Sequence, residues 1–264
     1  MRRSRITALA ASVLAVSAVV AAAAPGAVSA APEKLYLVSE AFTFDNGGVE
    51  VGVHGDANTV SAAKTADTAC TDGTYALKSW KVGTLTWLYN GAGVPAGISS
   101  TALSTITAST NSVASAQNRC GLAPLTGSTY KYGGTTTLKP QVNSNGTCGG
   151  NDGKSVTGWG ALPAKVLAYT CTYYNARGVV VSSDTLIDNV AYTWFTTLPA
   201  NCSGAKYDLQ TTLTHERLHT AGLGHVDQVK NAAQTMTPAS APCDTSRRLL
   251  GAGDYAGLKA LATR

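Results

Sequence analysis

Three histidines and a glutamate are spaced within residues 215–225 in a way that suits a bound metal ion. The stretch reads HERLHTAGLGH, which places His215, Glu216, His219, Gly222 and His225 in that order. On a helix of about 3.6 residues per turn, His215 and His219 share one face, with Glu216 beside them. Gly222 can end the helix in the left-handed conformation, so that the chain turns back and brings in His225.

The chemistry that this set predicts is zinc-assisted hydrolysis. Imidazole nitrogens are common zinc ligands, and three protein ligands leave a fourth position for water, as in catalytic sites. Zinc acidifies that water and polarises a carbonyl, while Glu216 can accept the proton as general base. A shorter H-E-x-x-H pattern also arises by chance on solvated helices. The additional Gly222 and His225, in a chain with four histidines, favour the metal site.

Beyond these residues, the sequence resembles the metzincin clan of zinc peptidases, and within it the matrixin-like members. Met236 follows His225 by eleven residues, in the sequence QTMTP, which is similar to the Met-turn beneath the zinc of that clan. Pro238 matches the Met-x-Pro form of matrixins, whereas astacin-like and serralysin-like members have tyrosine there. The resemblance implies that Met236 supports the zinc site from below. Methionine also fills core gaps well, and the two roles are compatible.

The resemblance extends from about residue 66 to the end of the sequence. Residues 84–90 are similar to the first strand of a matrixin domain, residues 253–261 to its closing helix, and residues 118–122 to the small secreted matrixin-like proteins of actinobacteria. It implies an α+β, zincin-like metzincin domain over 66–264, with a twisted mixed sheet, an active-site helix and a Met-turn. Leu218 departs from the glycine usual before the second histidine, which concerns packing rather than ligation.

Other metal sites have weaker support in the sequence. Vertebrate matrixins hold a second, structural zinc through upstream histidines, but His54 is the only other histidine, so we expect one catalytic zinc and no structural zinc. Asp152, Asp184 and Asp188 could contribute oxygen ligands to calcium. Aspartates in turns usually form Asx turns, however, and no EF-hand spacing is present.

Residues 1–30 have the pattern of a secretory signal peptide. Three arginines precede an apolar Ala/Val/Leu run, and Val-Ser-Ala comes before Ala31. We therefore expect a secreted, extracellular protein without a membrane anchor, and a monomer. Removing residues 1–30 lowers the formal charge from +5 to +2, which gives no argument for a nucleic-acid partner. Residues 31–65 could form a short propeptide or added edge strands.

Six cysteines are an even number in a protein expected outside the reducing cytosol, so three disulfides are expected. Many connectivities exist, and the sequence alone does not select one. We predict sequential pairing, Cys70 with Cys120, Cys148 with Cys171, and Cys202 with Cys243. Residues 118–121 (NRCG) also resemble the Pro-Arg-Cys-Gly "cysteine switch", in which a propeptide thiolate occupies the open position on zinc. The even cysteine count argues against that alternative.

The rest of the pattern outlines the elements around the motif. It predicts a strand at residues 84–90 and a helix that begins after a cap at Ser99 or Ser100. One face of that helix carries Leu103, Ile106, Thr110 and Val113. Residues 127–160 are rich in Gly, Ser, Thr and Asn, which indicates short strands with long turns. Residues 166–170 are β-branched, aromatic and apolar, as in a strand.

Some residues can be assigned to the zinc helix and to substrate binding. Asp208 can cap the helix, with Leu209 and Leu213 facing the core. Leu167–Ala168 resembles the Leu-Ala pair on the edge strand along which matrixins bind an extended substrate, although a plain sheet strand explains the pair equally well. Residues 236–241, which include Pro238, are expected to shape the pocket for the residue after the cleaved bond.

Together these expectations describe a secreted zinc-dependent endopeptidase. His215, His219 and His225 would bind zinc and Glu216 would act as general base. The partner would be a peptide or protein substrate in extended conformation, with neither nucleic acid nor membrane. Two alternatives stay open, a non-catalytic extracellular binding module that keeps its zinc, and a zinc hydrolase of a non-peptide amide or ester. Glu216 argues against the first, because a structural site needs only the ligands.

Overall fold

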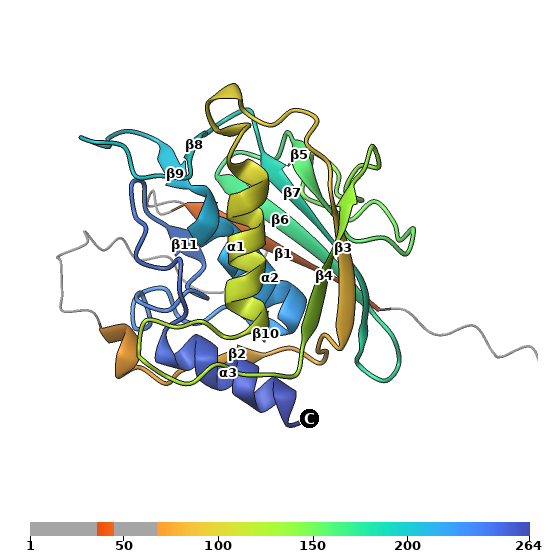
Figure 1. Cartoon of the computed structure of the whole chain (residues 1–264), viewed down its shortest axis with the longest axis vertical. Coiled ribbons are helices and arrows are strands. Elements are labelled where there is room, and N and C mark those ends of the chain that lie inside the picture. The colour runs from red at the N-terminus through yellow and green to blue at the C-terminus, as the bar shows by residue number, and fades with distance from the viewer. Residues whose placement is uncertain (1–35, 45–67) are drawn as a thin grey trace, which may run out of the picture. The chain divides into compact units, whose positions relative to one another are not determined.

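A seven-stranded mixed sheet forms the centre of the computed structural model, which describes residues 36–44 and 68–264. Its strands are β1 (Tyr36–Phe44), β3 (Thr84–Tyr89), β4 (Thr129–Thr135), β5 (Val156–Gly160), β6 (Val166–Tyr174), β7 (Val180–Asp188) and β11 (Ala239–Ser240). They lie in the order β11-β1-β6-β7-β5-β3-β4 (Figure 1). Strand β6 is antiparallel to both neighbours, while β3, β4, β5 and β7 are parallel.

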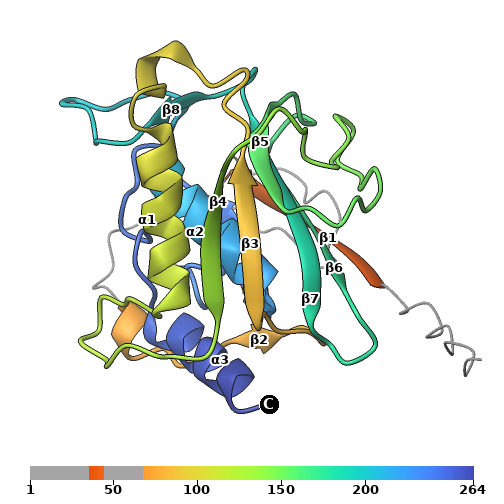
Figure 2. The ribbon, with the colours of Figure 1, turned by 45° about the vertical axis from the view of Figure 1, so that its right-hand side comes forward.

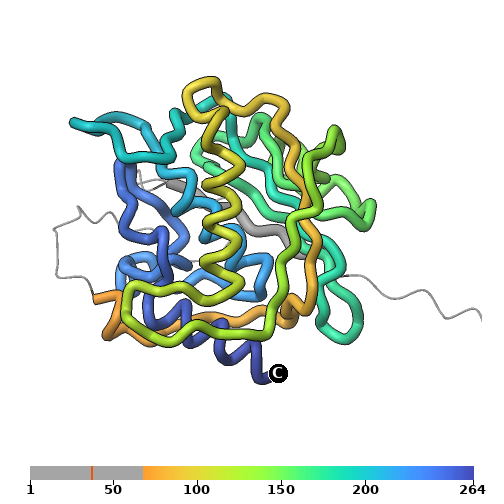
Figure 3. Tube along the Cα trace, viewed as in Figure 1, coloured from red at the N-terminus to blue at the C-terminus, as the bar shows by residue number. Residues whose placement is uncertain are grey.

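Three helices accompany the sheet in the described part of the chain. They are α1 (Ala102–Ala114), α2 (Leu209–Ala221) and α3 (Ala252–Ala262). Helices α1 and α2 pack together on one face of the sheet, as Figure 2 shows. The connection from α1 to β4 runs past α3 (Figure 3). The expected α+β class with a mixed sheet is confirmed.

Short elements complete the described fold. Two strand pairs are formed by β2 (Ala76–Leu77) with β10 (Leu223–Gly224), and by β8 (Thr193–Phe195) with β9 (Lys206–Asp208). Two 3-10 turns are η1 (Thr68–Cys70) and η2 (Ala96–Ile98). Strand β9 leads directly into α2, and β10 directly follows it. These pairs therefore anchor both ends of the helix that carries the histidine motif.

The main hydrophobic core fills the space between the sheet and the two packed helices. Trp87 of β3 and Ile187 of β7 contribute from the sheet, Ile106 from α1, and Leu209 and Leu213 from α2. Both leucines are fully buried, as the sequence predicted. Burying a side chain of this size stabilises the fold by about 1.5 to 3 kcal/mol, so these contacts hold α2 firmly against the sheet.

The predicted elements agree with the fold in type and differ at their ends. Strand β3 ends one residue before the predicted boundary. Helix α1 starts later than predicted, with Thr101 at its N-cap, because Ser99 already has helical backbone angles after the η2 turn. Its face is buried at Ile106, Thr110 and Val113, while Leu103 is half-buried. Turn-rich residues 127–160 form only β4 and β5.

All three predicted disulfides are present. Cys70 is bonded to Cys120, Cys148 to Cys171, and Cys202 to Cys243. The cysteine-switch alternative is wrong for this structure, because the sulfur of Cys120 is committed to a disulfide. Each bridge typically stabilises by about 2 to 4 kcal/mol. Three disulfides indicate an oxidising or extracellular environment.

Strand β6 is not an edge strand, which corrects the expectation for Leu167–Ala168. It pairs with β7 on one side and with β1 on the other. Both Leu167 and Ala168 are fully buried. The predicted signal peptide and His54 lie outside the described residues. No helix in the described ranges is long and apolar enough to span a membrane.

Candidate metal centre

Helix α2 begins where the sequence predicts, at a capping aspartate. The Asp208 carboxylate accepts a hydrogen bond of 2.9 Å from the amide of Thr211, which satisfies one of the open amides of the first turn. Arg248 donates to both oxygens of the same carboxylate, at 2.6 and 2.8 Å. Asp208 is almost completely buried, so this paired arrangement keeps its charge satisfied while it holds the first turn of the helix.

The end of α2 depends on Gly222, as predicted. Its φ of 116° lies in the left-handed region, and its amide donates to the carbonyls of Leu218 and His219. A Cβ at this position would lie 2.2 Å from the carbonyl oxygen of Trp80. Both the angle and the close approach therefore require glycine. The chain turns here and returns through β10 to His225.

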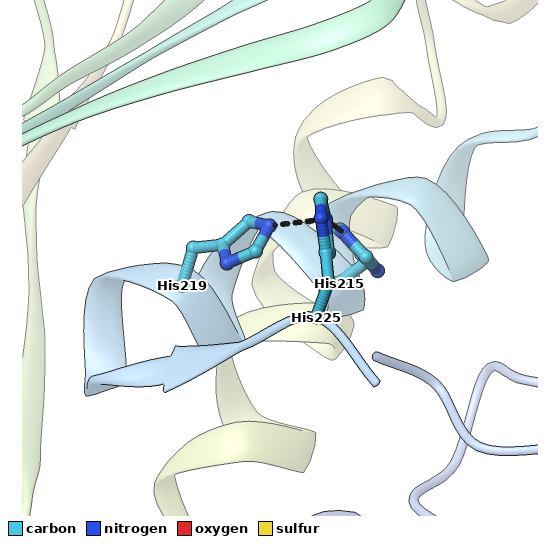
Figure 4. Close-up of side chains that lie close together, drawn as sticks. All are labelled: His215, His219 and His225. Carbon is cyan, nitrogen blue, oxygen red and sulfur yellow. Dashed lines mark hydrogen bonds between the residues drawn. The ribbon is translucent and has the colours of Figure 1, made fainter. Parts of the chain in front are cut away.

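Three imidazole rings converge after this turn (Figure 4). The Nε2 atom of His225 lies 3.1 Å from Nε2 of His215 and 3.0 Å from Nε2 of His219. At the other side of two rings, Nδ1 of His215 is 2.7 Å from the carbonyl oxygen of Thr235, and Nδ1 of His219 is 3.0 Å from that of Leu223. The three Nε2 atoms thus face a common point from two chain segments.

The hydrogen bonds of the first two rings decide what these nitrogens can do. A carbonyl oxygen only accepts, so Nδ1 of His215 and of His219 carries the proton, and Nε2 of each neutral ring carries a lone pair. A proton on Nε2 of His225 could be donated to only one of them. At least two lone pairs therefore point into the same small space, in which the ligand atoms of the three rings lie within 4.8 Å of one another, and a shared cation relieves this arrangement. The donor set fits a divalent metal ion.

Burial favours the neutral, metal-binding form of these histidines. His215 and His219 are fully buried, and His225 is half-buried. Desolvation, followed by the charges of the other two histidines, lowers the pKa of His215 well below its ordinary value. Desolvation lowers the pKa of His219 to about 3. Within the described residues, these three histidines are the group of side chains that could hold a metal ion. Their geometry does not select which metal.

Glu216 lies on the same helix, directly after the first histidine, and is fully buried. Its Oε2 accepts a hydrogen bond from the hydroxyl of Thr170 on β6. That hydroxyl also lies 3.0 Å from the hydroxyl of Thr185 on β7. The sheet therefore fixes the orientation of this carboxylate through neutral hydroxyl groups, next to the histidine cluster.

Met236 lies in a buried turn that contacts the cluster through its neighbour. The carbonyl of Thr235 accepts from His215, and the carbonyl of Met236 accepts from the amide of Val226, at 3.0 Å. Met236 is 1% exposed and packs in a second hydrophobic cluster that includes Leu218 of α2. The turn thus joins the second segment of the metal centre to the packed core.

Asp254 holds this turn, although no motif in the sequence points to it. Its carboxylate accepts from the amides of Thr235, Met236 and Gly251 at 2.7, 3.1 and 2.9 Å. Burial raises the pKa of Asp254, and the three backbone hydrogen bonds oppose that rise. The bond to Gly251 satisfies an open amide at the start of α3. An acidic residue in the first turn of this helix is readable from the sequence, but its contact with the distant turn is not.

Arg217 of α2 is a second residue that no sequence motif points to, and it is fully buried. Its guanidinium donates to the hydroxyls of Thr110 and Thr157, at 3.1 and 2.7 Å, and lies 5.1 Å from the ring centroid of Trp87. Burial lowers its pKa to about 10. The motif helix therefore directs its histidines toward the metal centre and its arginine into the α1–sheet interface.

The aspartates considered as calcium ligands accept hydrogen bonds from backbone amides. Asp152 accepts from the amide of Lys154, and Asp184 from that of Val156. Asp188 accepts amide hydrogen bonds from residues 162, 190 and 191. None of the three belongs to a metal-binding group among the described residues. Pro238 is buried, two residues beyond Met236.

Comparison of the sequence with protein-family models and with curated proteins gives no match.

Proposed function

We propose that the protein is a secreted zinc-dependent endopeptidase, similar to the matrixin-like metzincins. The observation that carries this proposal is the convergence of the Nε2 atoms of His215, His219 and His225 beside the buried carboxylate of Glu216. Three neutral nitrogen donors suit zinc, and a site with three protein ligands keeps a position open for chemistry. The half-burial of His225 marks the more accessible side of the cluster.

The residues of the chain have separate roles in this proposal. The three histidines hold the ion, and the carbonyls of Thr235 and Leu223 fix the proton positions of two of the rings. Bound zinc supplies a Lewis acid that polarises the substrate carbonyl and acidifies water. Glu216, oriented by Thr170, takes a proton from the attacking water and delivers it to the leaving amine nitrogen. Met236 and its turn support His215 from the adjoining segment.

Secretion is part of the same proposal. The three disulfides agree with folding in an oxidising compartment, and residues 1–30 have the pattern of a cleaved signal peptide. A soluble extracellular peptidase would meet its substrates as extended segments of other proteins. The buried glutamate beside the cluster favours this enzyme over a binding module, because the three histidine ligands alone would satisfy a structural zinc site.

The decisive experiment compares metal content with peptide hydrolysis. The secreted protein is purified, its metal is measured by mass spectrometry, and a mixed peptide library and a simple ester are offered with and without a chelator. We expect one zinc per chain and chelator-sensitive cleavage of peptides. Glu216→Gln should retain zinc and lose at least about 100-fold in turnover, since a general base contributes that much or more.

A matched control is Asp152→Asn, which makes the same carboxylate-to-amide change in an exposed turn. It should leave both zinc content and turnover unchanged. Undiminished hydrolysis by zinc-loaded Glu216→Gln protein would refute the assigned role. Zinc without hydrolysis of either substrate would favour the binding module, and hydrolysis of the ester alone would favour a non-peptide hydrolase.

A further inference from the structure

Helix α2 buries a positive charge that no carboxylate pairs with. The guanidinium of Arg217 is fully buried, and its hydrogen bonds go to the neutral hydroxyls of Thr110 on α1 and Thr157 on β5. Within residues 36–44 and 68–264, Arg217 takes part in no ion pair. A guanidinium that leaves water loses its hydration, and neutral hydroxyls compensate for that loss only in part. The buried charge therefore needs a further partner.

One nitrogen of this guanidinium lacks a hydrogen-bond partner as well. Nε donates to Thr110 and Nη2 to Thr157, whereas Nη1 is buried and has no acceptor in the described part of the chain. Nη1 carries two N–H groups that can only donate. The ring of Trp87, whose centroid lies 5.1 Å from the guanidinium carbon, offers its face and no lone pair. The missing partner of Nη1 must therefore be an acceptor.

A second buried group without a partner lies close to this guanidinium. The hydroxyl of Tyr130 on β4 is buried, and no described residue forms a hydrogen bond with it. Burial raises the pKa of Tyr130, so the hydroxyl keeps its proton and can donate it. The charge of Arg217 lowers the same pKa, which shows that the two groups are near enough to interact. Two unpartnered donors thus come from different elements.

The order of the strands explains why these donors meet. Strands β5, β3 and β4 lie side by side, with β3 in the middle (Figure 2). The guanidinium contacts Thr157 of β5 and lies over Trp87 of β3, and β4 with Tyr130 is the next strand. The Tyr130 ring packs against the same hydrophobic cluster as Trp87. Both donors are therefore enclosed between the helices and one part of the sheet.

The chemistry of this enclosed place favours an anion over a water molecule. A water molecule would bring two donors of its own to a place where the oxygens of Thr110 and Thr157 already accept from Arg217. An anion only accepts, and it also balances the buried charge. Because both donor atoms are shielded from solvent, a monatomic anion fits the place better than a carboxylate or a sulfate.

We propose that the protein binds one halide ion, with chloride as the common example, between Nη1 of Arg217 and the hydroxyl of Tyr130. The ion neutralises the guanidinium and joins α2 to β4, so it stabilises the helix that carries the histidine cluster. Neither residue belongs to the metal centre, and the proposal does not depend on peptidase activity.

The first test measures thermal stability in sodium chloride, sodium bromide and sodium acetate, at equal ionic strength and fixed zinc content. A ligand that binds only the folded chain raises Tm by an amount that grows with its concentration. We expect chloride to raise the Tm of the full wild-type chain over acetate by at least about 2 °C. Bromide should act in the same direction, because it offers the same charge and no donor.

Two tyrosine variants separate this site from general effects of salt. Tyr130→Phe keeps the ring and removes the donor, so it should lose at least about half of the chloride-dependent rise in Tm. The control is Tyr132→Phe, on the same strand but 43% exposed, which should keep the full rise. Zinc also binds halides, but that effect would persist in Tyr130→Phe. An equal response to chloride in wild type and Tyr130→Phe would overturn the proposal.

A second measurement uses the wild-type chain alone, so it does not depend on the folding of a variant. The protein is refolded in bromide with its disulfides intact, crystallised, and measured at the absorption edge of bromine, where bromide scatters anomalously and water does not. An anomalous peak between Arg217 and Tyr130 is the expected result. Water at this position without an anomalous signal, or anomalous peaks on the surface only, which would mark an adventitious ion only, would refute the halide site.

Discussion

The pH dependence of stability should contain a contribution from one buried carboxyl group, Asp184 on β7. This residue is fully buried, and its carboxylate accepts from the amide of Val156 at 3.0 Å. Burial raises its pKa from 3.8 to about 7, and the amides of Val156 and Gln141 limit the rise. The charge of Asp152 raises it further.

The sign follows from which state of the chain keeps the proton. Below the ordinary pKa, the carboxyl is protonated in both the folded and the unfolded chain, and the folded state keeps its full stability. As the pH rises from about 4 to about 7, the unfolded chain releases this proton first, so the free energy of unfolding falls. Between about pH 5 and about pH 8 the loss from this group is about 3 kcal/mol, at about 1.36 kcal/mol for each unit of pKa.

The substitution Asp184→Asn removes the titration while it keeps an oxygen that can accept from Val156. The free energy of unfolding of both proteins is measured by chemical denaturation across the pH range. We expect the variant to gain about 3 kcal/mol relative to wild type between about pH 5 and about pH 8, or roughly 6 to 12 °C in Tm. Any effect of the asparagine side chain on stability that does not depend on pH cancels when the values at the two pH limits are subtracted. A wild-type-minus-variant difference that is independent of pH would refute the reasoning.

Four further predictions concern the helix and its surroundings. Thr170→Val should lower kcat by roughly 10- to 100-fold at unchanged zinc content, because it removes a hydrogen bond to a charged group, while Thr170→Ser should retain activity; equal rates in steady-state kinetics would contradict this. Gly222→Ala should destabilise by more than about 2 kcal/mol and weaken metal binding, as seen by denaturation and metal titration, because of its angle and of the Trp80 carbonyl. Thr157→Val should cost about 1 to 3 kcal/mol by leaving a donor of Arg217 without its acceptor, and a neutral result in denaturation would argue against that bond. Chelation should lower Tm, by an amount that grows with metal affinity, and a Tm that ignores both chelator and added zinc would argue against a metal centre.

The parts of the site that the sequence predicts are those set by local rules. The four-residue spacing of two histidines, the capping aspartate Asp208 and the left-handed Gly222 each depend on a few neighbouring residues. These local features therefore form in the same way in many different folds. The even cysteine count predicts three disulfides by a similarly simple rule, whereas the sequential pairing was one choice among many connectivities that the sequence does not distinguish.

The parts that escaped prediction depend on contacts between distant segments. Asp254 reaches the Met236 turn across 18 residues, and nothing local to either segment specifies that partner. Strand β6 looked like an edge because its sequence cannot reveal whether another segment pairs with it. The covering strand comes from residues 36–44, about 130 positions earlier, and its register is set by tertiary contacts.

Helix α2 buries two charged side chains, Glu216 and Arg217, and the surface of the sheet beneath it explains how they are accommodated. Hydroxyl side chains occupy inward positions where a strand facing the core usually has apolar residues. They pair across the strands, Thr170 with Thr185 and Thr172 with Ser183, both at 3.0 Å. Ser183 also pairs with Thr220 of α2, at 2.8 Å. Hydroxyls both donate and accept, so one such surface can serve the anion of Glu216 and the cation of Arg217. A basic residue in place of Thr170 would stabilise the glutamate charge and make the proposed base weaker. A neutral hydroxyl orients the carboxylate with a smaller loss of basicity, which explains a threonine at this buried position.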